Sequence, residues 1–209
     1  HRTIFAAVLV VLTLVSLLPL RQAVVASSVG KLFLGDSPAY RRYLELAHKF
    51  TNDEILLLAF EGSDPFDPEV LPRLRQAAGA IAELPTVEAV LSPLDLRHVE
   101  RGEEGLRIEP WEDALARSPG ARAALLAEIA ADPLGEGLIM GRAGSWAILV
   151  VQSQDARRPA EESIRVVAEA TDALVAAGFP RESIHRGGLL VLLEQVVALT
   201  FENLTVFLP

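Results

Sequence analysis

The chain contains no cysteine among its 209 residues. This absence excludes disulfide bonds, thiol catalysis and cysteine metal sites, and it leaves the redox compartment undetermined. A basic excess is missing too, because 28 acidic residues outnumber 19 lysines and arginines and give a formal net charge of -9. Since a phosphate-binding surface needs clustered basic residues, this balance argues against nucleic-acid binding. A folded domain in this chain must be held together by packing alone.

Motifs for metal binding and acid–base chemistry are also missing. The histidines show neither paired spacing nor a cluster with carboxylates of metal type, so we predict no metal site. The adjacent acidic pairs Asp53-Glu54 and Glu103-Glu104 are interpreted as solvated loop charge without a catalytic role. We expect surface or helix-end positions for the four histidines, which are His1, His48, His98 and His185.

The serine and glycine patterns also give no indication of catalysis or of phosphate binding. Ser145 and Ser163 stand outside a G-x-S-x-G context, and the sequence supplies no base to either. Gly187-Gly188 lacks the G-x-x-x-x-G-K-[ST] pattern of a phosphate loop and is better explained as a turn between a strand and a helix. We therefore predict no catalytic residue, no cofactor site and no enzymatic activity.

What the chain does contain is an uninterrupted apolar run from Ile4 to Leu20, flanked by Arg2 and Arg21. As a helix this run would be roughly 25 Å long, at the short end for a hydrocarbon core of about 30 Å. Because no charge interrupts it, we predict a transmembrane helix within residues 1–26. A cleaved secretory signal is the alternative, since small residues follow the run. Residue 1 is His rather than Met, so we expect a longer parent sequence.

The remaining residues alternate between helix and strand patterns. Helices are predicted where apolar residues recur every three or four positions after a cap or a proline, and strands where short apolar runs are bounded by turn residues. These rules predict helices over 38–50, 67–84, 159–178 and 189–208, and strands over 54–62, 86–92, 145–152 and 183–187. The last of these strands and helices would be joined at Gly187-Gly188, and a hairpin is predicted around 141–144.

Two strand–helix–strand units in series predict an α+β class with a ferredoxin-like (βαββαβ) domain, in which both helices lie on one face of the sheet. The least regular part, about 95–135, is interpreted as a mainly helical insertion with a helix near 121–131. In the last helix Glu194 and Glu202 oppose an apolar side. Because carboxylates are costly inside a bilayer, we predict an amphipathic helix over 189–209 that leads back toward the membrane.

Four segments carry a family resemblance, and they follow one another in family order: FLGDSPAYRRYLELAHKFTNDEILLLAFEG, LRQAAGAIAELPTVEAVLSPLDL, ADPLGEGLIMGRAGSWAILVV and IHRGGLLVLLEQVVALTFENLTVFLP. Together with the apolar run they resemble the first transmembrane segment and first extracytoplasmic porter domain of the resistance-nodulation-division (RND) superfamily. The chain is most similar to the bacterial subgroup that includes MMPL-type lipid transporters and the hopanoid transporter.

The resemblance implies a proton-driven exporter of the bacterial inner membrane, with residues 27–188 as a periplasmic porter-type domain. Its partners would be the lipid bilayer, a hydrophobic or lipid-like substrate and the remainder of the transporter chain, with homo-oligomerisation left open. The proton relay of such proteins lies in later membrane helices, and residues 4–20 offer only Thr13 and Ser16 as polar groups.

Two other functions remain open at this stage. A membrane-anchored or secreted α/β binding domain would recruit a protein partner, and an extracytoplasmic enzyme would need a polar pocket within the insertion. Individual substrate-binding residues cannot be assigned. Core packing is favoured over an apolar ligand cleft for the large side chains Phe60, Phe66, Trp111, Met140 and Trp146.

Overall fold

The computed structural model describes residues 4, 8, 11–13, 15, 37–50, 54–61, 64–102, 105–131, 139, 145–153 and 159–207. These residues form helices and antiparallel sheets, which confirms the predicted α+β class. Most of the predicted transmembrane helix over 1–26 lies outside them. The described residues of that run are helical and exposed, namely Ile4, Val8, Val11, Leu12, Thr13 and Val15. Across the described part of the chain, none of the helices combines the length and the apolar character needed to cross a bilayer.

A four-stranded antiparallel sheet organises the molecule, and its strands lie in the order β2-β5-β1-β6. Leu58 of β1 is paired with Ile148 of β5 and, on its other side, with Arg186 of β6. The central strand β5 is buried along its whole length, whereas burial alternates along β1. The four predicted strands are thus present: β1 (Ile55–Phe60), β2 (Val87–Leu91), β5 (Trp146–Gln152) and β6 (His185–Gly187).

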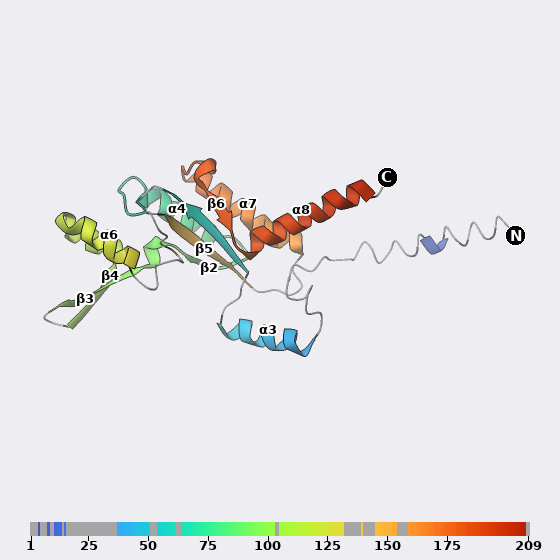
Figure 1. Ribbon diagram of the computed structural model, residues 1–209, viewed down its shortest axis with the longest axis horizontal. Helices are drawn as coiled ribbons and strands as arrows, with labels where there is room; N and C mark the ends of the chain where they lie inside the picture. The colour runs from blue at the N-terminus through green and yellow to red at the C-terminus, as the bar shows by residue number, and fades with distance from the viewer. Residues whose placement is uncertain are drawn as a thin grey trace.

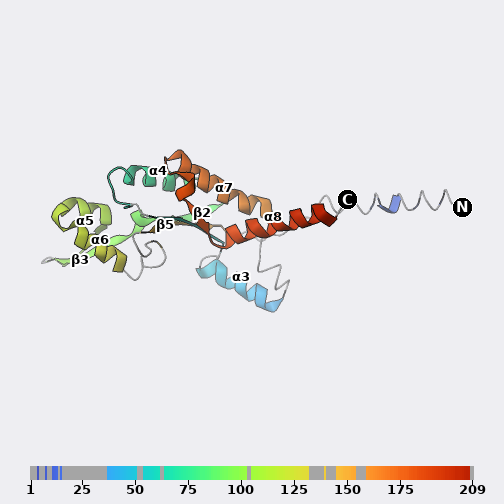
Figure 2. The same cartoon turned by 45° about the horizontal axis from the view of Figure 1, so that its top comes forward.

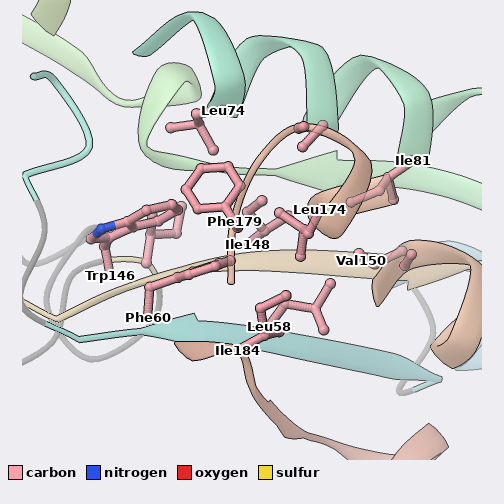
Figure 3. Packing of buried hydrophobic residues seen from close by; sticks show 14 of the residues in the cluster. Leu58, Phe60, Leu74, Ile81, Trp146, Ile148, Val150, Leu174, Phe179 and Ile184 are labelled. Atoms are coloured by element: carbon pink, nitrogen blue, oxygen red, sulfur yellow. The ribbon is translucent and has the colours of Figure 1, made fainter. Parts of the chain in front are cut away.

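Helices α4 (Leu71–Ala82) and α7 (Ala160–Ala176) pack together on one face of this sheet (Figures 1 and 2). Each follows one strand and precedes the next, because α4 connects β1 to β2 and α7 connects β5 to β6. Their buried side chains meet those of the sheet in one core, and Figure 3 labels among them Leu58, Phe60, Leu74, Ile81, Ile148, Val150 and Leu174. We call β1, α4, β2, β5, α7 and β6 the core unit.

An aromatic group fills one end of the core unit. Phe60 and Trp146 are direct partners in the register of β1 and β5, and their rings stack with centroids 4.3 Å apart. Phe179, which follows α7, packs against both rings at 5.0 and 5.9 Å (Figure 3). Gly178 allows this approach, because its φ of +95° ends α7 and turns the chain back toward the sheet.

The start of α4 differs from the prediction. Asp67-Pro68 was expected to open the helix, but residues 67–70 form turns and the helix begins at Leu71. The reason is local, since the Asp67 carboxylate accepts a hydrogen bond from the Glu69 amide at 2.8 Å and so stabilises a turn. Pro72 then lies in the first turn of the helix. Backbone amides there have no acceptor within the helix, so the missing amide hydrogen of proline breaks no hydrogen bond.

Helices α3 (Pro38–Phe50) and α8 (Leu189–Phe207) flank the core unit in the sequence, and both are present as predicted. α3 lies on the other side of the sheet from α4 and α7 in both views (Figures 1 and 2). α8 packs on β1 and α7 near its start and then extends away from the sheet (Figure 1). Apolar side chains are not confined to the predicted face of α8, because its exposed residues include Leu192, Val196 and Leu199.

Gly188 joins β6 to α8, which confirms the turn predicted at Gly187-Gly188. Its φ is +97°, and a Cβ added there would lie 2.3 Å from the carbonyl oxygen of Ile55. Only glycine combines a positive φ with so close an approach to a neighbouring backbone. This residue therefore fixes where α8 leaves the sheet.

Residues 93–131, which we call the insertion, follow β2. Here the prediction of an irregular, mainly helical segment is only partly right. The expected helix near 121–131 is present as α6 (Arg122–Ala131), but a β-hairpin was missed. The elements are 3₁₀ helix η1 (Pro93–Asp95), strands β3 (Arg97–Gly102) and β4 (Gly105–Pro110), helix α5 (Trp111–Arg117), 3₁₀ helix η2 (Pro119–Ala121) and α6. The hairpin predicted around 141–144 lies outside the described residues.

The insertion lies at the end of the molecule opposite to the C-terminal end of α8 (Figures 1 and 2). Two ion pairs connect it to the core unit and its β1–α4 loop. Arg75 of α4 places Nη2 2.6 Å from Glu112 of α5, and Arg122 of α6 places Nη2 2.5 Å from the carboxylate of Asp64. Its buried side chains, including Trp111 and Leu115, join the same hydrophobic cluster as the sheet.

Candidate functional site

The large apolar candidates are part of the core. Phe60, Phe66, Trp111 and Trp146 are all no more than 4% exposed and belong to one hydrophobic cluster. This agrees with packing rather than with a ligand cleft. Met140 lies outside the described residues.

Several polar candidates are placed differently from expectation. Glu54 is buried at the start of β1 rather than solvated, and its carbonyl oxygen accepts a hydrogen bond from the Gln152 amide at 3.0 Å. Ser163 is fully buried in α7, whereas Ser145 is half-buried before β5. Asp53, Glu103 and Glu104 lie outside the described residues, as does His1.

The histidines separate into different environments. His48 lies in the last turn of α3, which fits the expected helix-end position, and His185 is exposed on β6, which fits the expected surface position. His98 is different, because only 5% of it is exposed. The expectation of a surface position is therefore wrong for His98, which lies on the inner face of the insertion hairpin.

The pairing of β3 and β4 gathers polar groups around His98. In their register His98 is opposite Glu109 and Glu100 is opposite Arg107. Because alternate residues of a strand share a face, His98 and Glu100 lie on the same side of β3. His98 Nδ1 lies 3.6 Å from Glu109 Oε1, and one ligand atom from each of His98, Glu100 and Glu109 falls within 4.8 Å of the others.

Arg117, in the last turn of α5, bridges the two carboxylates of this group. Its guanidinium lies 2.5 Å from the Glu109 carboxylate and 3.3 Å from Glu100 Oε2. The hydrogen bond from Arg117 lowers the pKa of Glu109 below its ordinary value, although burial opposes the shift. The same hydrogen bond raises the pKa of Arg117. Glu109 is therefore held in its ionised form by its pairing with Arg117.

The imidazole of His98 is enclosed on its remaining sides. The Trp111 ring packs against it at a centroid distance of 4.6 Å, and Nε2 lies 3.8 Å from Glu128 Oε1 of α6. Within the described part of the chain, His98 Nδ1 and Trp111 Nε1 are buried without a hydrogen-bond partner. A buried polar atom left in this way costs about 1–3 kcal/mol, so the arrangement calls for an explanation.

The outer face of the same hairpin exposes three large apolar side chains. Val99 and Ile108 are paired across the strands and are 53% and 66% exposed, and Leu106 beside them is 69% exposed. Along β3 and β4 the buried residue is thus the polar His98, whereas the apolar Val99, Leu106 and Ile108 are exposed on the face that also carries Arg97 and Arg101.

Sequence reasoning missed this site for a definable reason. His98 and Glu100 are two residues apart, but Glu109, Arg117 and Glu128 approach them only when the hairpin closes and the helices pack on it. The sequence did contain a signal for the hairpin. Polar and apolar residues alternate in the segment that ends at Gly102 and again in the segment that begins at Gly105, and this pattern predicts a short hairpin.

Comparisons with models of known protein families and with curated proteins found no match for this chain.

Proposed function

We propose that this chain is the first transmembrane segment and first periplasmic porter-type domain of an RND-superfamily exporter of hydrophobic or lipid-like molecules. The observation that best supports this proposal is the arrangement of the core unit. Its strand order β2-β5-β1-β6, with α4 and α7 packed together on one face, is consistent with a ferredoxin-like βαββαβ domain that receives an insertion between its second and third strands. This is the domain type that the resemblance implies.

The two ends of the described structure are compatible with attachment to a bilayer. The helical residues 11–13 and the C-terminal end of α8 lie on the same side of the molecule, away from the insertion (Figure 1). Exposed apolar side chains accompany both, for example Val11 and Leu12 near the start and Val196 and Leu199 on α8. Such surfaces favour contact with lipid or with neighbouring membrane helices.

The proposed location can be tested by reporter fusions in a bacterial host. Alkaline phosphatase, which is active only outside the cytoplasm, should be active when fused after Phe207, and green fluorescent protein at the same position should remain dark. The reverse pattern would reject a periplasmic domain. A carbonate wash of the membranes distinguishes a retained transmembrane helix from a cleaved secretory signal. With a retained helix the protein stays in the membrane pellet, whereas cleavage of the signal releases the domain into the supernatant.

The transport role needs a second test in the native bacterium. Deletion of residues 54–187 from the full-length gene should cause a lipid-like compound to accumulate in the inner membrane, as measured by mass spectrometry of separated membranes. The intact gene supplied on a plasmid should restore the distribution. Unchanged lipid profiles together with unchanged efflux of hydrophobic dyes would contradict an exporter.

A second function, a binding domain that recruits a protein partner, is favoured by the exposed outer face of the β3–β4 hairpin. The coding sequence after Pro209 distinguishes the two functions. An exporter requires it to continue into a transmembrane helix and further spans with buried acidic residues, whereas an anchored or secreted binding domain does not.

A further inference from the structure

The ligand atoms of His98, Glu100 and Glu109 converge on one small volume of the insertion. We propose that these three side chains form a binding site for a divalent transition-metal ion, for which Zn²⁺ is the probe. The proposal does not depend on the transport role described above.

The spacing of the ligand atoms suits a metal better than a hydrogen bond. At 3.6 Å, His98 Nδ1 and Glu109 Oε1 are too far apart for a good hydrogen bond. Two ligands of one tetrahedral zinc ion, bound at 2.0–2.2 Å, stand about 3.3 Å apart. All three ligand atoms lie within 4.8 Å of one another, so an ion would have to draw them only slightly closer together.

The buried imidazole is the independent observation that points to a ligand. His98 is only 5% exposed, and within the described residues its Nδ1 has no hydrogen-bond partner although it faces Glu109. Its other nitrogen, Nε2, faces Glu128 at 3.8 Å. Metal-binding histidines usually donate a hydrogen bond from the second nitrogen to a carboxylate, and Glu128 is placed to accept one after a small movement from 3.8 Å.

The donor set indicates which kind of ion would bind. One imidazole and two carboxylates suit Zn²⁺ and related transition metals, whereas Mg²⁺ and Ca²⁺ prefer sites made of oxygen alone. The scaffold is well supported, since all three ligands come from the paired strands β3 and β4 and Trp111 packs against the imidazole. Glu100 is about half exposed and gives an ion access from solvent.

Arg117 is the internal competitor of the metal. Its guanidinium lies on both Glu109 and Glu100, and so neutralises the carboxylates that an ion would need. Binding must move this side chain toward solvent, where it is already 38% exposed. The metal site and the ion pair are therefore alternatives, and removal of Arg117 should favour the metal.

The test uses the full chain purified in detergent without a histidine tag. Isothermal titration calorimetry with ZnCl₂ should show saturable binding of one ion per chain, and MgCl₂ should give no comparable signal. Glu100→Gln changes a partly exposed side chain and should weaken zinc binding by about tenfold or more. Arg117→Gln should strengthen zinc binding and increase the rise in melting temperature caused by zinc.

Matched variants separate this site from a purely structural ion cluster. Glu112→Gln removes a carboxylate from the same helix as Arg117 but outside the cluster, and it should leave zinc affinity unchanged. His98→Ala should abolish binding, and Glu100→Gln provides the same information if His98→Ala does not fold. Absence of zinc binding in both the parent chain and Arg117→Gln would overturn the proposal, as would zinc affinity that is indifferent to Glu100→Gln.

Discussion

In both the core unit and the insertion, alternate residues of a strand face opposite sides of the sheet. The two regions differ in which kind of side chain lies on the covered side. In β1 the buried positions are Leu56, Leu58 and Phe60, which pack under α4 and α7. In the insertion hairpin the inner position is His98, and the apolar Val99 and Ile108 are exposed. Strand pairing alone therefore does not dictate which residues are buried. The helices that cover each sheet decide it, and in the insertion they enclose a polar residue at a cost in free energy.

The two regions should also differ in what stabilises them. The core unit removes large apolar side chains from water, which is the dominant favourable term in folding. The insertion has a smaller share of such residues, and its ion pairs are partly exposed, for example Arg75 with Glu112 at 58% and 31%. Exposed ion pairs contribute only about 0–1 kcal/mol each.

The largest effect is expected from Trp146→Ala in the core unit. This change removes a side chain that is 1% exposed and that stacks on Phe60 at 4.3 Å. A cavity of this kind should lower the free energy of unfolding by about 3–5 kcal/mol, measured by urea denaturation with circular dichroism. Leu199→Ala on the exposed side of α8 is the control and should change it by less than about 0.5 kcal/mol. Similar losses in both variants would contradict the assigned core.

The next largest effect is expected from Gly188→Ala. The new Cβ would meet the Ile55 carbonyl oxygen at 2.3 Å in a backbone with φ of +97°. The left-handed conformation alone costs about 1–2 kcal/mol, and the contact adds to it, so we expect a loss of at least about 2 kcal/mol. Gly187→Ala is the matched control, since its Cβ would make ordinary contacts at 3.9 Å. Equal tolerance of both changes would show that α8 is not fixed at this joint.

The contrast between the regions can be measured directly, because the chain has two tryptophans and each region holds one of them. In Trp146→Phe the remaining Trp111 reports on the insertion, and in Trp111→Phe the remaining Trp146 reports on the core unit. In Trp146→Phe, the urea midpoint measured by Trp111 fluorescence should be roughly 0.5 M lower than the midpoint measured by circular dichroism. This difference corresponds to an insertion that is less stable than the core unit by about 1 kcal/mol. Coincident transitions would indicate that the two regions unfold as one.

The smallest effect is expected on the outer face of the hairpin. Ile108→Thr replaces a side chain that is already 66% exposed, so the free energy of unfolding should change by less than about 0.5 kcal/mol. A loss above about 1 kcal/mol would mean that this face is covered. Sedimentation at several protein concentrations would then reveal whether a second copy of the chain covers it.

Regular amphipathic patterns made the core unit predictable. The predicted stripe of α7 includes Val167, Thr171 and Leu174, which are buried, and Gly178 ends the helix where the sequence indicated. Polar residues were less informative, because burial is decided by distant parts of the chain. Glu54 and His98 were expected in solvent, and neither burial could be inferred from neighbouring residues. The charged strands β3 and β4 lack the apolar runs on which strand prediction depends.

The position of the insertion between β2 and β5 has a wider consequence. These strands are neighbours in the sheet, with Leu91 paired to Leu149, so the segment between them leaves and re-enters the core unit at adjacent points. Closing such a loop becomes only about 0.6 kcal/mol more costly for each doubling of its length. This junction is therefore where related chains can lengthen, shorten or exchange a whole module during evolution, while the strand order and the helices behind it stay the same.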